Sequence, residues 1–139
     1  MNLPNNLDYN EIKIGDENSF TRTISQHDMA VFAELSGDFN PLHMNEEFGK
    51  KSPFKKNIVH GMMAGSLFST LVGMHCPGQK SLYMSQTLNF RLPIYPGETV
   101  IVKGIVAAKN DSIKMIILKT QILKKGSIAI DGEAKIKVL

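Results

Sequence analysis

Hydrophobic and polar residues alternate along several long segments in the carboxyl-terminal half of the chain. A period of two residues predicts strands with one buried face. The predicted strands are residues 81–92, 99–110, 112–123 and 127–139, and the turns between them are residues 93–98, 110–111 and 125–126. Successive strands joined by short turns indicate an antiparallel meander.

Residues 60–75 follow a helical period instead. Adjacent apolar stripes run along this segment, one formed by Met63, Leu67, Leu71 and Met74 and the other by Ala64, Phe68 and Val72. Because adjacent stripes leave little polar circumference, the pattern predicts a buried helix. Small residues would let a neighbouring backbone approach closely. An interior glycine costs a helix roughly 1 kcal/mol, so either the glycines lie at fraying ends or close packing offsets this cost. The small residues are Gly61, Ala64, Gly65 and Gly73.

The amino-terminal part of the chain predicts a strand and another helix. Residues 19–25 alternate as a strand does. Ser25 and Asp28 have the spacing of a capping box, so we expect a helix to begin there and to end at Gly37. Its expected core residues are Met29, Val31, Phe32 and Leu35. Residues 38–57 are turn-rich and polar, with residues 46–56 expected on the surface.

A buried helix followed by antiparallel strands predicts an α+β fold, in which a curled sheet wraps around a long central helix. Length and composition agree with a single domain over residues 1–139. The chain has 139 residues, of which 42% are hydrophobic and 21% charged, which is ordinary for a globular domain.

Charge and hydropathy restrict the classes of function. The net charge of +3 suits an anionic ligand or an acidic partner. The chain has no basic run with interleaved aromatic residues, which disfavours nucleic-acid binding. No apolar run approaches the ~20 residues of a membrane span, and the amino terminus has no signal-peptide pattern. We therefore expect a cytoplasmic protein without membrane contacts.

The single cysteine, Cys76, cannot form an internal disulfide. It precedes a Pro-Gly step, and the neighbouring His75 does not by itself make a catalytic dyad. A cysteine in the core or in a loop is the favoured interpretation.

Candidate chemistry is concentrated in the sequence SGDFNPLH, residues 36–43. Its glycine and its Asn-Pro step force a tight, non-helical path, so that Asp38 and His43 can converge on one water. A carboxylate and an imidazole that share a water form a general acid–base pair. The alternative is that Asp38 caps a turn and His43 lies on the surface.

The start of the buried helix is a second candidate. A helix N-terminus presents unpaired amide groups, so the Gly61 N–H is a candidate oxyanion donor, although Gly61 can also simply ease helix entry. For His60 a hydrogen-bonded structural role is favoured over a role as a ligand. Asp38, His43 and His60 match no tight metal signature, so no metal is expected. Ser69 lies outside a nucleophile elbow and by itself indicates only a hydroxyl of the helix surface or core.

Longer stretches place these residues in a known pattern. FAELSGDFNPLH (residues 32–43) and IVHGMMAGSLFSTLVG (residues 58–73) resemble the MaoC-like dehydratases, specifically the (R)-specific enoyl-CoA hydratases. The similarity extends from about Phe20 through residues 77–100 to residues 132–138. The motif requires an aromatic and a small residue and then G-D-x-N-P-aliphatic-H. It is matched by Phe32, Ser36, Gly37, Asp38, Asn40, Pro41, Leu42 and His43. One departure is Gly49, where the motif has Ala or Ser, and it puts the local loop shape in doubt.

The resemblance implies a hot-dog fold that works as a homodimer or a dimer-based oligomer. It places the catalytic pair on Asp38 and His43, the oxyanion donor on the Gly61 amide and a pocket hydroxyl on Ser69. Asn40 falls on the motif asparagine, which we expect to hold the turn at the substrate site. The implied reaction is reversible hydration of a trans-2-enoyl thioester to the (R)-3-hydroxyacyl product, with no metal or redox cofactor.

Other functions use the same elements. The acyl chain can be carried by acyl carrier protein instead of coenzyme A, since both carriers are anionic. A hot-dog thioesterase would hydrolyse the thioester, but the arrangement GDFNPLH favours the hydratase. A non-enzymatic acyl-thioester sensor would need an output domain and would not need both Asp38 and His43.

Overall fold

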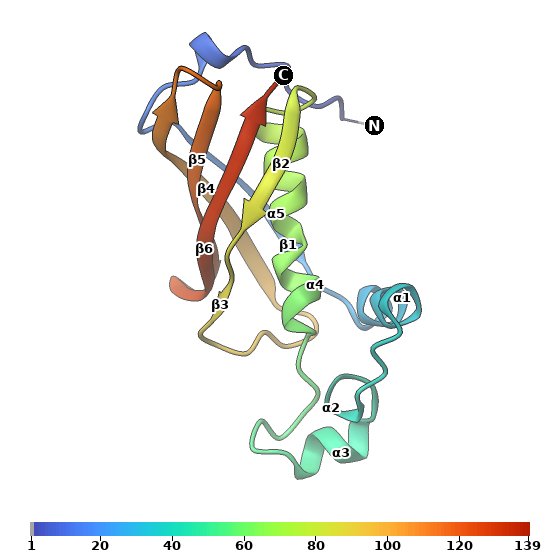
Figure 1. The fold of residues 1–139 in the computed structure, drawn as a ribbon. Coiled ribbons are helices and arrows are strands. Elements are labelled where there is room, and N and C mark those ends of the chain that lie inside the picture. The colour runs from blue at the N-terminus through green and yellow to red at the C-terminus, as the bar shows by residue number, and fades with distance from the viewer. Residues whose placement is uncertain (1) are drawn as a thin grey trace.

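A curled antiparallel sheet forms the body of the molecule (Figure 1). The structure is a computed structural model that describes residues 2–139. The strands are β1 (Glu17–Thr23), β2 (Ser81–Gln86), β3 (Asn89–Phe90), β4 (Thr99–Asn110), β5 (Met115–Lys124) and β6 (Ser127–Val138). Their order is β1-β4-β5-β6-β2, and β3 also pairs with β6.

Strands β4, β5 and β6 form the meander that the alternation predicts. The prediction is wrong for residues 81–92, because β2 pairs with β6 rather than with β4. The outer edge of β4 is already taken by β1, which pairs along its whole length, so the free edge of the meander is that of β6.

The predicted strand over residues 81–92 is also interrupted, between β2 and β3. The carbonyl oxygen of Thr87 lies over Gly132 of β6, only 1.8 Å from where a Cβ atom on that glycine would be. The Thr87 hydroxyl accepts a hydrogen bond from the Glu133 N–H at 2.9 Å. The chain therefore crosses β6 closely at this point, which only a glycine permits, instead of continuing as one regular strand.

The helical elements are η1 (Tyr9–Glu11), α1 (Gln26–Ser36), α2 (Pro41–Met44), α3 (Glu46–Lys51), α4 (Gly61–Gly65), α5 (Leu67–Thr70) and η2 (Leu71–His75). The last three follow one another along the sheet and form the predicted long helix (Figure 1). Its final turns, η2, are π-helical. A sheet curled around this helix is the expected hot-dog arrangement.

The central helix is buried on its sheet-facing side only. Ala64, Phe68 and Leu71 belong to the core, together with residues of β4 and β6. Leu71 lies against Gly104 of β4, where a Cβ atom would stand 2.7 Å from its side chain. The opposite side of the helix is exposed at Met62, Ser66, Ser69 and Thr70. The prediction of a fully buried helix is therefore wrong for this side within one chain.

Close packing occurs at some of the helix glycines. A Cβ atom on Gly61 would lie 2.9 Å from the ring of Phe90, and one on Gly65 would lie 3.0 Å from Leu88. Side chains of the β2–β3 region therefore pack where the sequence predicted close approach of a backbone. At Gly73, in the last turn of the helix, a Cβ atom would meet nothing within 4 Å, so the alternative of a glycine near a helix end applies there.

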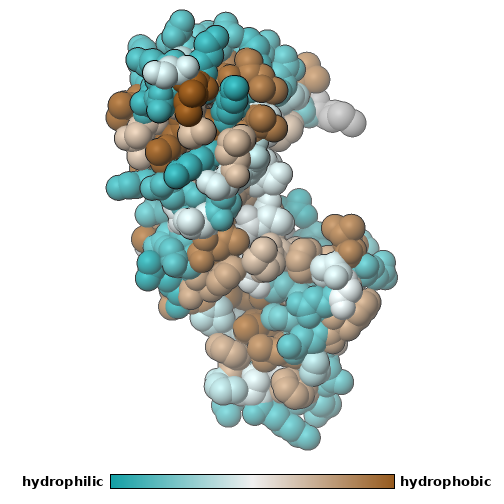
Figure 2. All heavy atoms as spheres, viewed as in Figure 1, coloured by the Kyte–Doolittle hydropathy of each residue, from teal (hydrophilic) through white to brown (hydrophobic). Residues whose placement is uncertain are grey.

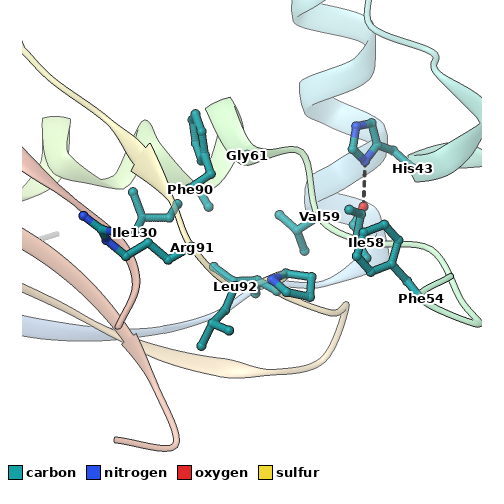
Figure 3. Close-up of a pocket in the computed structure, with 12 residues that line it drawn as sticks. His43, Phe54, Ile58, Val59, Gly61, Phe90, Arg91, Leu92 and Ile130 are labelled. Atoms are coloured by element: carbon teal, nitrogen blue, oxygen red, sulfur yellow. Dashed lines mark hydrogen bonds between the residues drawn. The ribbon is translucent and has the colours of Figure 1, made fainter. Parts of the chain in front are cut away.

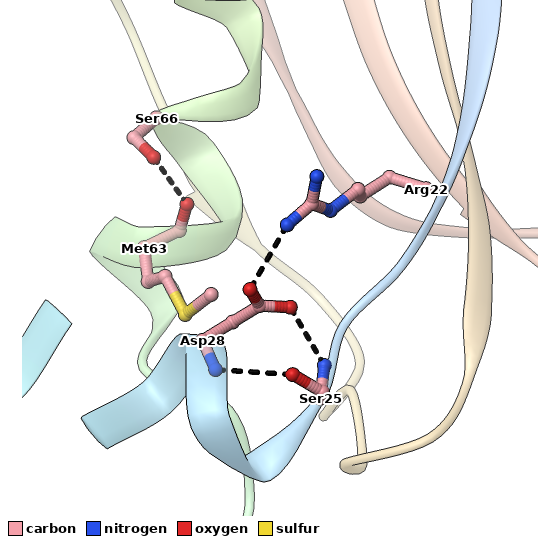
Figure 4. A network of polar contacts seen from close by, with 5 residues as sticks. All are labelled: Arg22, Ser25, Asp28, Met63 and Ser66. Atoms are coloured by element: carbon pink, nitrogen blue, oxygen red, sulfur yellow. Dashed lines mark hydrogen bonds and ion pairs between the residues drawn. The ribbon is translucent and has the colours of Figure 1, made fainter. Parts of the chain in front are cut away.

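Helix α1 begins and ends as its sequence predicts, and Figure 4 shows the contacts at its beginning. The Asp28 N–H donates to the Ser25 hydroxyl at 3.0 Å, and the Ser25 N–H donates to the Asp28 carboxylate at 2.8 Å. Arg22 of β1 forms an ion pair with Asp28 at 2.9 Å. At the other end Gly37 has φ +79°, the left-handed conformation that closes a helix. The capping box thus ties α1 to the end of β1.

The predicted core face of α1 is only partly buried. Met29 and Ala33 are buried and Phe32 is partly buried, but Val31 is 49% exposed and Leu35 is 84% exposed. The prediction of Val31 and Leu35 as core residues is wrong for a single chain. In Figure 1 helix α1 lies beside the first turns of the central helix and away from the sheet, and α2 and α3 extend beyond the end of the sheet, so the sheet does not cover these helices.

Residues 38–57 contain the short helices α2 and α3, where the sequence predicts only turns. The surface prediction for residues 46–56 is wrong at Gly49 and Ser52, which are buried. A Cβ atom on Gly49 would lie 2.6 Å from the backbone nitrogen of Asn57. The departure from the family motif at Gly49 thus coincides with a close backbone approach.

None of the helices in residues 2–139 combines the length and the apolarity that crossing a membrane requires.

Candidate active site

The turn between α1 and α2 is held by bonds from side chains to the backbone. The Ser36 hydroxyl accepts from the Asp38 N–H at 3.2 Å, and the Asp38 carboxylate accepts from the Asn40 N–H at 3.1 Å. The Asn40 side chain accepts from the Leu42 N–H at 2.9 Å and caps α2. Asn40 thus holds the turn, and Asp38 caps it, as the alternative interpretation required.

His43 is partly buried, so the alternative of a surface histidine is wrong. Its Nδ1 lies 2.8 Å from the Ile58 carbonyl oxygen (Figure 3). A carbonyl oxygen can only accept, so Nδ1 carries a proton and donates, and in the neutral imidazole Nε2 keeps the free lone pair. The tertiary contact with Ile58 therefore orients the imidazole of His43.

Asp38, His43 and His60 come together in space. One donor atom from each side chain lies within 4.8 Å of the others. The rings of His43 and His60 are stacked with centroids 4.1 Å apart. Asp38 is exposed, His43 is intermediate and His60 is buried, so the cluster runs from the surface into the interior. The Asp38 carboxylate therefore caps the turn and also lies close to the imidazole of His43.

The residue types of this cluster can bind a divalent cation, because imidazole and carboxylate are common zinc ligands. Both histidines already use one ring nitrogen on a carbonyl group, that of Ile58 for His43 and that of Asp38 for His60. Each therefore has one nitrogen left. The expectation that the site works without a metal stays a prediction.

A cavity of about 360 Å³ adjoins the cluster (Figure 3). His43 and Gly61 line it together with mostly apolar side chains, namely Phe54, Ile58, Val59, Ala64, Phe90, Leu92, Pro93, Ile94 and Ile130, and with Arg91. Gly61 is the first residue of α4, where the amide has no intrahelical acceptor. The structure therefore brings the proposed oxyanion donor and His43 to the same apolar cavity.

Much of the cavity wall was not anticipated from the sequence. Phe54 lies in the segment expected on the surface, and Phe90 lies in an expected regular strand. The sequence feature that could have indicated this wall is the pair of glycines in α4, because Phe90 packs against Gly61 and Leu88 packs against Gly65. Arg91 also lines the cavity, but its Nε–H donates to the Asp131 carboxylate at 2.6 Å. This bond holds the pKa of Asp131 below its ordinary value.

Ser69 does not join the other predicted site residues. It lies in α5, eight positions after Gly61, which corresponds to about 12 Å along a helix. Ser69 is exposed in the single chain, and it does not line this cavity. Its role as a pocket hydroxyl stays a prediction.

Cys76 is buried, as the favoured interpretation of a core cysteine expected. Burial raises the pKa of its thiol to about 11. The thiolate, which is the nucleophilic form, is therefore scarce at neutral pH.

Comparison with known proteins places this chain in a family. The family model for the MaoC like domain matches residues 10–126. The chain is 37% identical to an (R)-specific enoyl-CoA hydratase from Aeromonas caviae over 128 residues, 91% of this chain and 96% of that protein. It is 35% identical to a mitochondrial 3-hydroxyacyl-[acyl-carrier-protein] dehydratase from Arabidopsis thaliana over 127 residues, covering 88% of this chain and 75% of that protein.

A solved structure of a similar protein has the same fold. An R-hydratase from Pseudomonas aeruginosa, in the unliganded form, superposes with a TM-score of 0.91 at 32% identity. The match covers 96% of this chain and 86% of that one. Sequence and fold thus agree, and the chain belongs to the MaoC-like domain family, with the hot-dog fold.

Proposed function

We propose that this protein is a hydro-lyase that catalyses the (R)-specific hydration of trans-2-enoyl-CoA to (R)-3-hydroxyacyl-CoA, and the reverse dehydration. The observation that carries the proposal is the convergence of Asp38 and His43 beside an apolar cavity whose wall includes Gly61. The names of several similar proteins, which are (R)-specific enoyl-CoA hydratases or hydroxyacyl dehydratases, support the same reaction.

In the proposed mechanism the thioester carbonyl oxygen accepts a hydrogen bond from the Gly61 N–H, and the acyl chain occupies the apolar cavity. Asp38 and His43 hold one water near C3. As the bond from the water oxygen to C3 forms, a proton leaves the water for this pair and the C2=C3 π electrons move toward C2 and the thioester. A proton delivered to C2 completes the product. The negative charge that builds on the thioester oxygen is stabilised by the N-terminus of α4.

The orientation of His43 supports its part in this mechanism. Since Nδ1 donates to the Ile58 carbonyl, Nε2 is the ring atom able to accept a proton from the water. Asp38 lies at the same cluster and is assigned the proton transfer jointly with His43. No step in the proposal requires a metal or a redox cofactor.

The carrier of the acyl chain defines a second candidate function. Similar proteins from Arabidopsis thaliana and Solanum lycopersicum are named as dehydratases of 3-hydroxyacyl-[acyl-carrier-protein]. Phe54, which lines the cavity, is followed directly by the exposed Lys55 and Lys56. These positive charges suit the phosphates of coenzyme A and an acidic carrier protein alike. The proposal is therefore an enoyl-CoA hydratase, with the carrier-protein dehydratase as the alternative.

The proposed enzyme is a homodimer. Strand β2 ends the sheet, and no further strand within residues 2–139 pairs with its outer edge; such edges are templates for pairing with another chain. Figure 2 shows hydrophobic side chains on the surface of both the sheet body and the region of the short helices. The exposed side of the central helix, which carries Ser69, would also be covered in a dimer. We therefore propose that Ser69 acts as a pocket hydroxyl only in the dimer.

The test is hydration of crotonyl-CoA by the purified protein, followed by loss of the enoyl-thioester absorbance and by the chirality of the product. We expect rapid formation of the (R)-alcohol. The same assay with crotonyl-acyl carrier protein compares the carriers, and release of a free thiol would instead indicate a thioesterase. A folded protein that hydrates neither thioester contradicts the proposal.

A further inference from the structure

His60 is a buried histidine with an unused ring nitrogen. Its exposed fraction is 1%, and the other buried polar residues of the described chain are Ser52 and Thr120. The hydroxyls of those two residues are hydrogen-bonded. By contrast, Nδ1 of His60 has no hydrogen-bond partner in residues 2–139. Since buried polar groups are nearly always paired, a histidine at this position calls for an explanation that an apolar core residue would not.

The other nitrogen of His60 holds the backbone of the acid. Nε2 lies 3.0 Å from the carbonyl oxygen of Asp38, 22 positions earlier in the chain. Because the carbonyl accepts, Nε2 carries a proton, and in the neutral imidazole Nδ1 carries the lone pair. The turn that bears Asp38 is exposed, and this bond connects it to a buried side chain.

The ring of His60 supports the base. Phe32 meets this ring edge-on, with the ring centroids 5.0 Å apart and an interplanar angle of 62°. His43 stacks on it, with the centroids 4.1 Å apart and an interplanar angle of 28°. His43 is held at its edge by the Ile58 carbonyl and on its face by His60. Its orientation is therefore set by both contacts.

We infer that His60 is the positioning residue of this site, an inference that rests on the proposed hydratase function. Its Nε2–H fixes Asp38 through the backbone, and its ring face fixes the imidazole of His43. His60 also occupies the N-cap position of α4, directly before Gly61, although its side chain makes no capping hydrogen bond. The residue that contacts the acid and the base is therefore adjacent in the chain to the oxyanion donor. His60 touches no reacting atom in this assignment.

Two variants separate the two contacts. His60→Phe keeps a ring against His43 but has no donor for the Asp38 carbonyl. His60→Gln keeps an Nε2 donor but removes the ring. Misplacement of a catalytic group by about 1 Å can cost about 10²-fold in rate, so we expect each variant to lower kcat by about that factor while KM changes little. A folded His60→Phe protein with the kcat of the wild type overturns the inference.

His75 provides a matched control. Its ring also stacks on an aromatic ring, that of Phe20, with the centroids 5.3 Å apart. His75 lies at the end of the central helix that is opposite to Gly61. His75→Phe should leave kcat unchanged. The double variant His60→Phe with Asp38→Asn adds a further readout, because the rate effects of substitutions at residues that act as a unit are not additive. If His60 acts through Asp38, His60→Phe should lower the residual rate of Asp38→Asn far less than it lowers that of the wild type, and a full additive loss contradicts the inference.

One measurement depends neither on turnover nor on the folding of a variant. Long-range ¹H–¹⁵N spectra of the wild-type protein with ¹⁵N-labelled histidine report which nitrogen of each ring carries the proton. We expect the proton of His60 on Nε2 and that of His43 on Nδ1. A His60 ring protonated on Nδ1 alone overturns the inference even if the protein is an active hydratase. The expected pattern in an inactive protein would contradict the proposed function and leave the positioning contacts standing.

Discussion

The ring of Phe90 lies in the space that a side chain on Gly61 would need, since a Cβ atom there would stand 2.9 Å from two ring carbons. Phe90 thus forms the cavity wall directly beside the first amide of α4. A test of this amide has to separate the loss of the N–H from the loss of space.

For that reason we predict the effect of Gly61→Pro in a Phe90→Leu background. Proline is well tolerated as the first residue of a helix, and His60, with ψ 125°, has a conformation compatible with a following proline. The hydration rate should fall by ~10²–10³-fold, as on loss of an oxyanion donor. The matched control is Gly61→Ala with Phe90→Leu, which adds bulk but keeps the N–H. Equal rates for the two double variants would remove the amide from the mechanism.

The substitution Asp38→Asn should abolish most of the activity without unfolding the turn. Asparagine keeps an oxygen that can accept from the Asn40 N–H but loses the negative charge. A fall of ~10²–10⁴-fold in turnover is expected for loss of general acid–base help. Circular dichroism should show an unchanged fold, and Glu34→Gln, an exposed carboxylate of α1, serves as the control. Near-normal turnover would exclude Asp38.

Chelation tests whether the cluster of Asp38, His43 and His60 works without a metal. Treatment with EDTA followed by dialysis should leave the hydration rate unchanged, because the proposed mechanism uses only protein groups. Metal analysis of the purified protein provides the second measurement. Loss of activity on chelation, with recovery on addition of zinc, would contradict the metal-free mechanism.

The capping box of α1 makes a contribution to stability that depends on pH. The bond from the Ser25 N–H, together with the contacts to the Ser25 hydroxyl and Arg22, holds the pKa of Asp28 below its ordinary value of 3.8. A depressed pKa stabilises the folded state above the ordinary value and ceases to do so as the pH falls through the lowered one. Asp28→Asn should therefore cost about 1 kcal/mol at pH 7. In urea denaturation at pH 3 this difference should be smaller, and a constant difference would contradict the assignment.

The outer edge of β2 predicts the oligomeric state. Met84 of β2 is 54% exposed, and a lysine there should oppose pairing with a second chain. Light scattering at micromolar concentration should show a dimer for the wild type and a shift toward monomer for Met84→Lys. Ile113→Lys, a similarly exposed apolar position in the turn between β4 and β5, should remain dimeric. A monomeric wild type would count against the proposed dimer.

The sequence by itself determined the local elements and the identity of the catalytic candidates. The capping box of Ser25 and Asp28, the left-handed Gly37 and the alternation of β4 to β6 each depend on neighbours in the chain, and each is confirmed. Asp38 and His43 were recognisable because a tight turn brings residues five positions apart together whatever surrounds them.

The tertiary structure decided which distant segments meet. Periodicity reports that one face of a strand is buried but does not name its partner, so β2 was placed beside the wrong strand. Likewise, a helical stripe does not tell whether its far side is covered, which Ser69 shows. The contacts of His60 with Asp38, and of Phe90 with Gly61, join residues more than 20 positions apart, and only the packing of the sheet against the central helix and the preceding turn creates them.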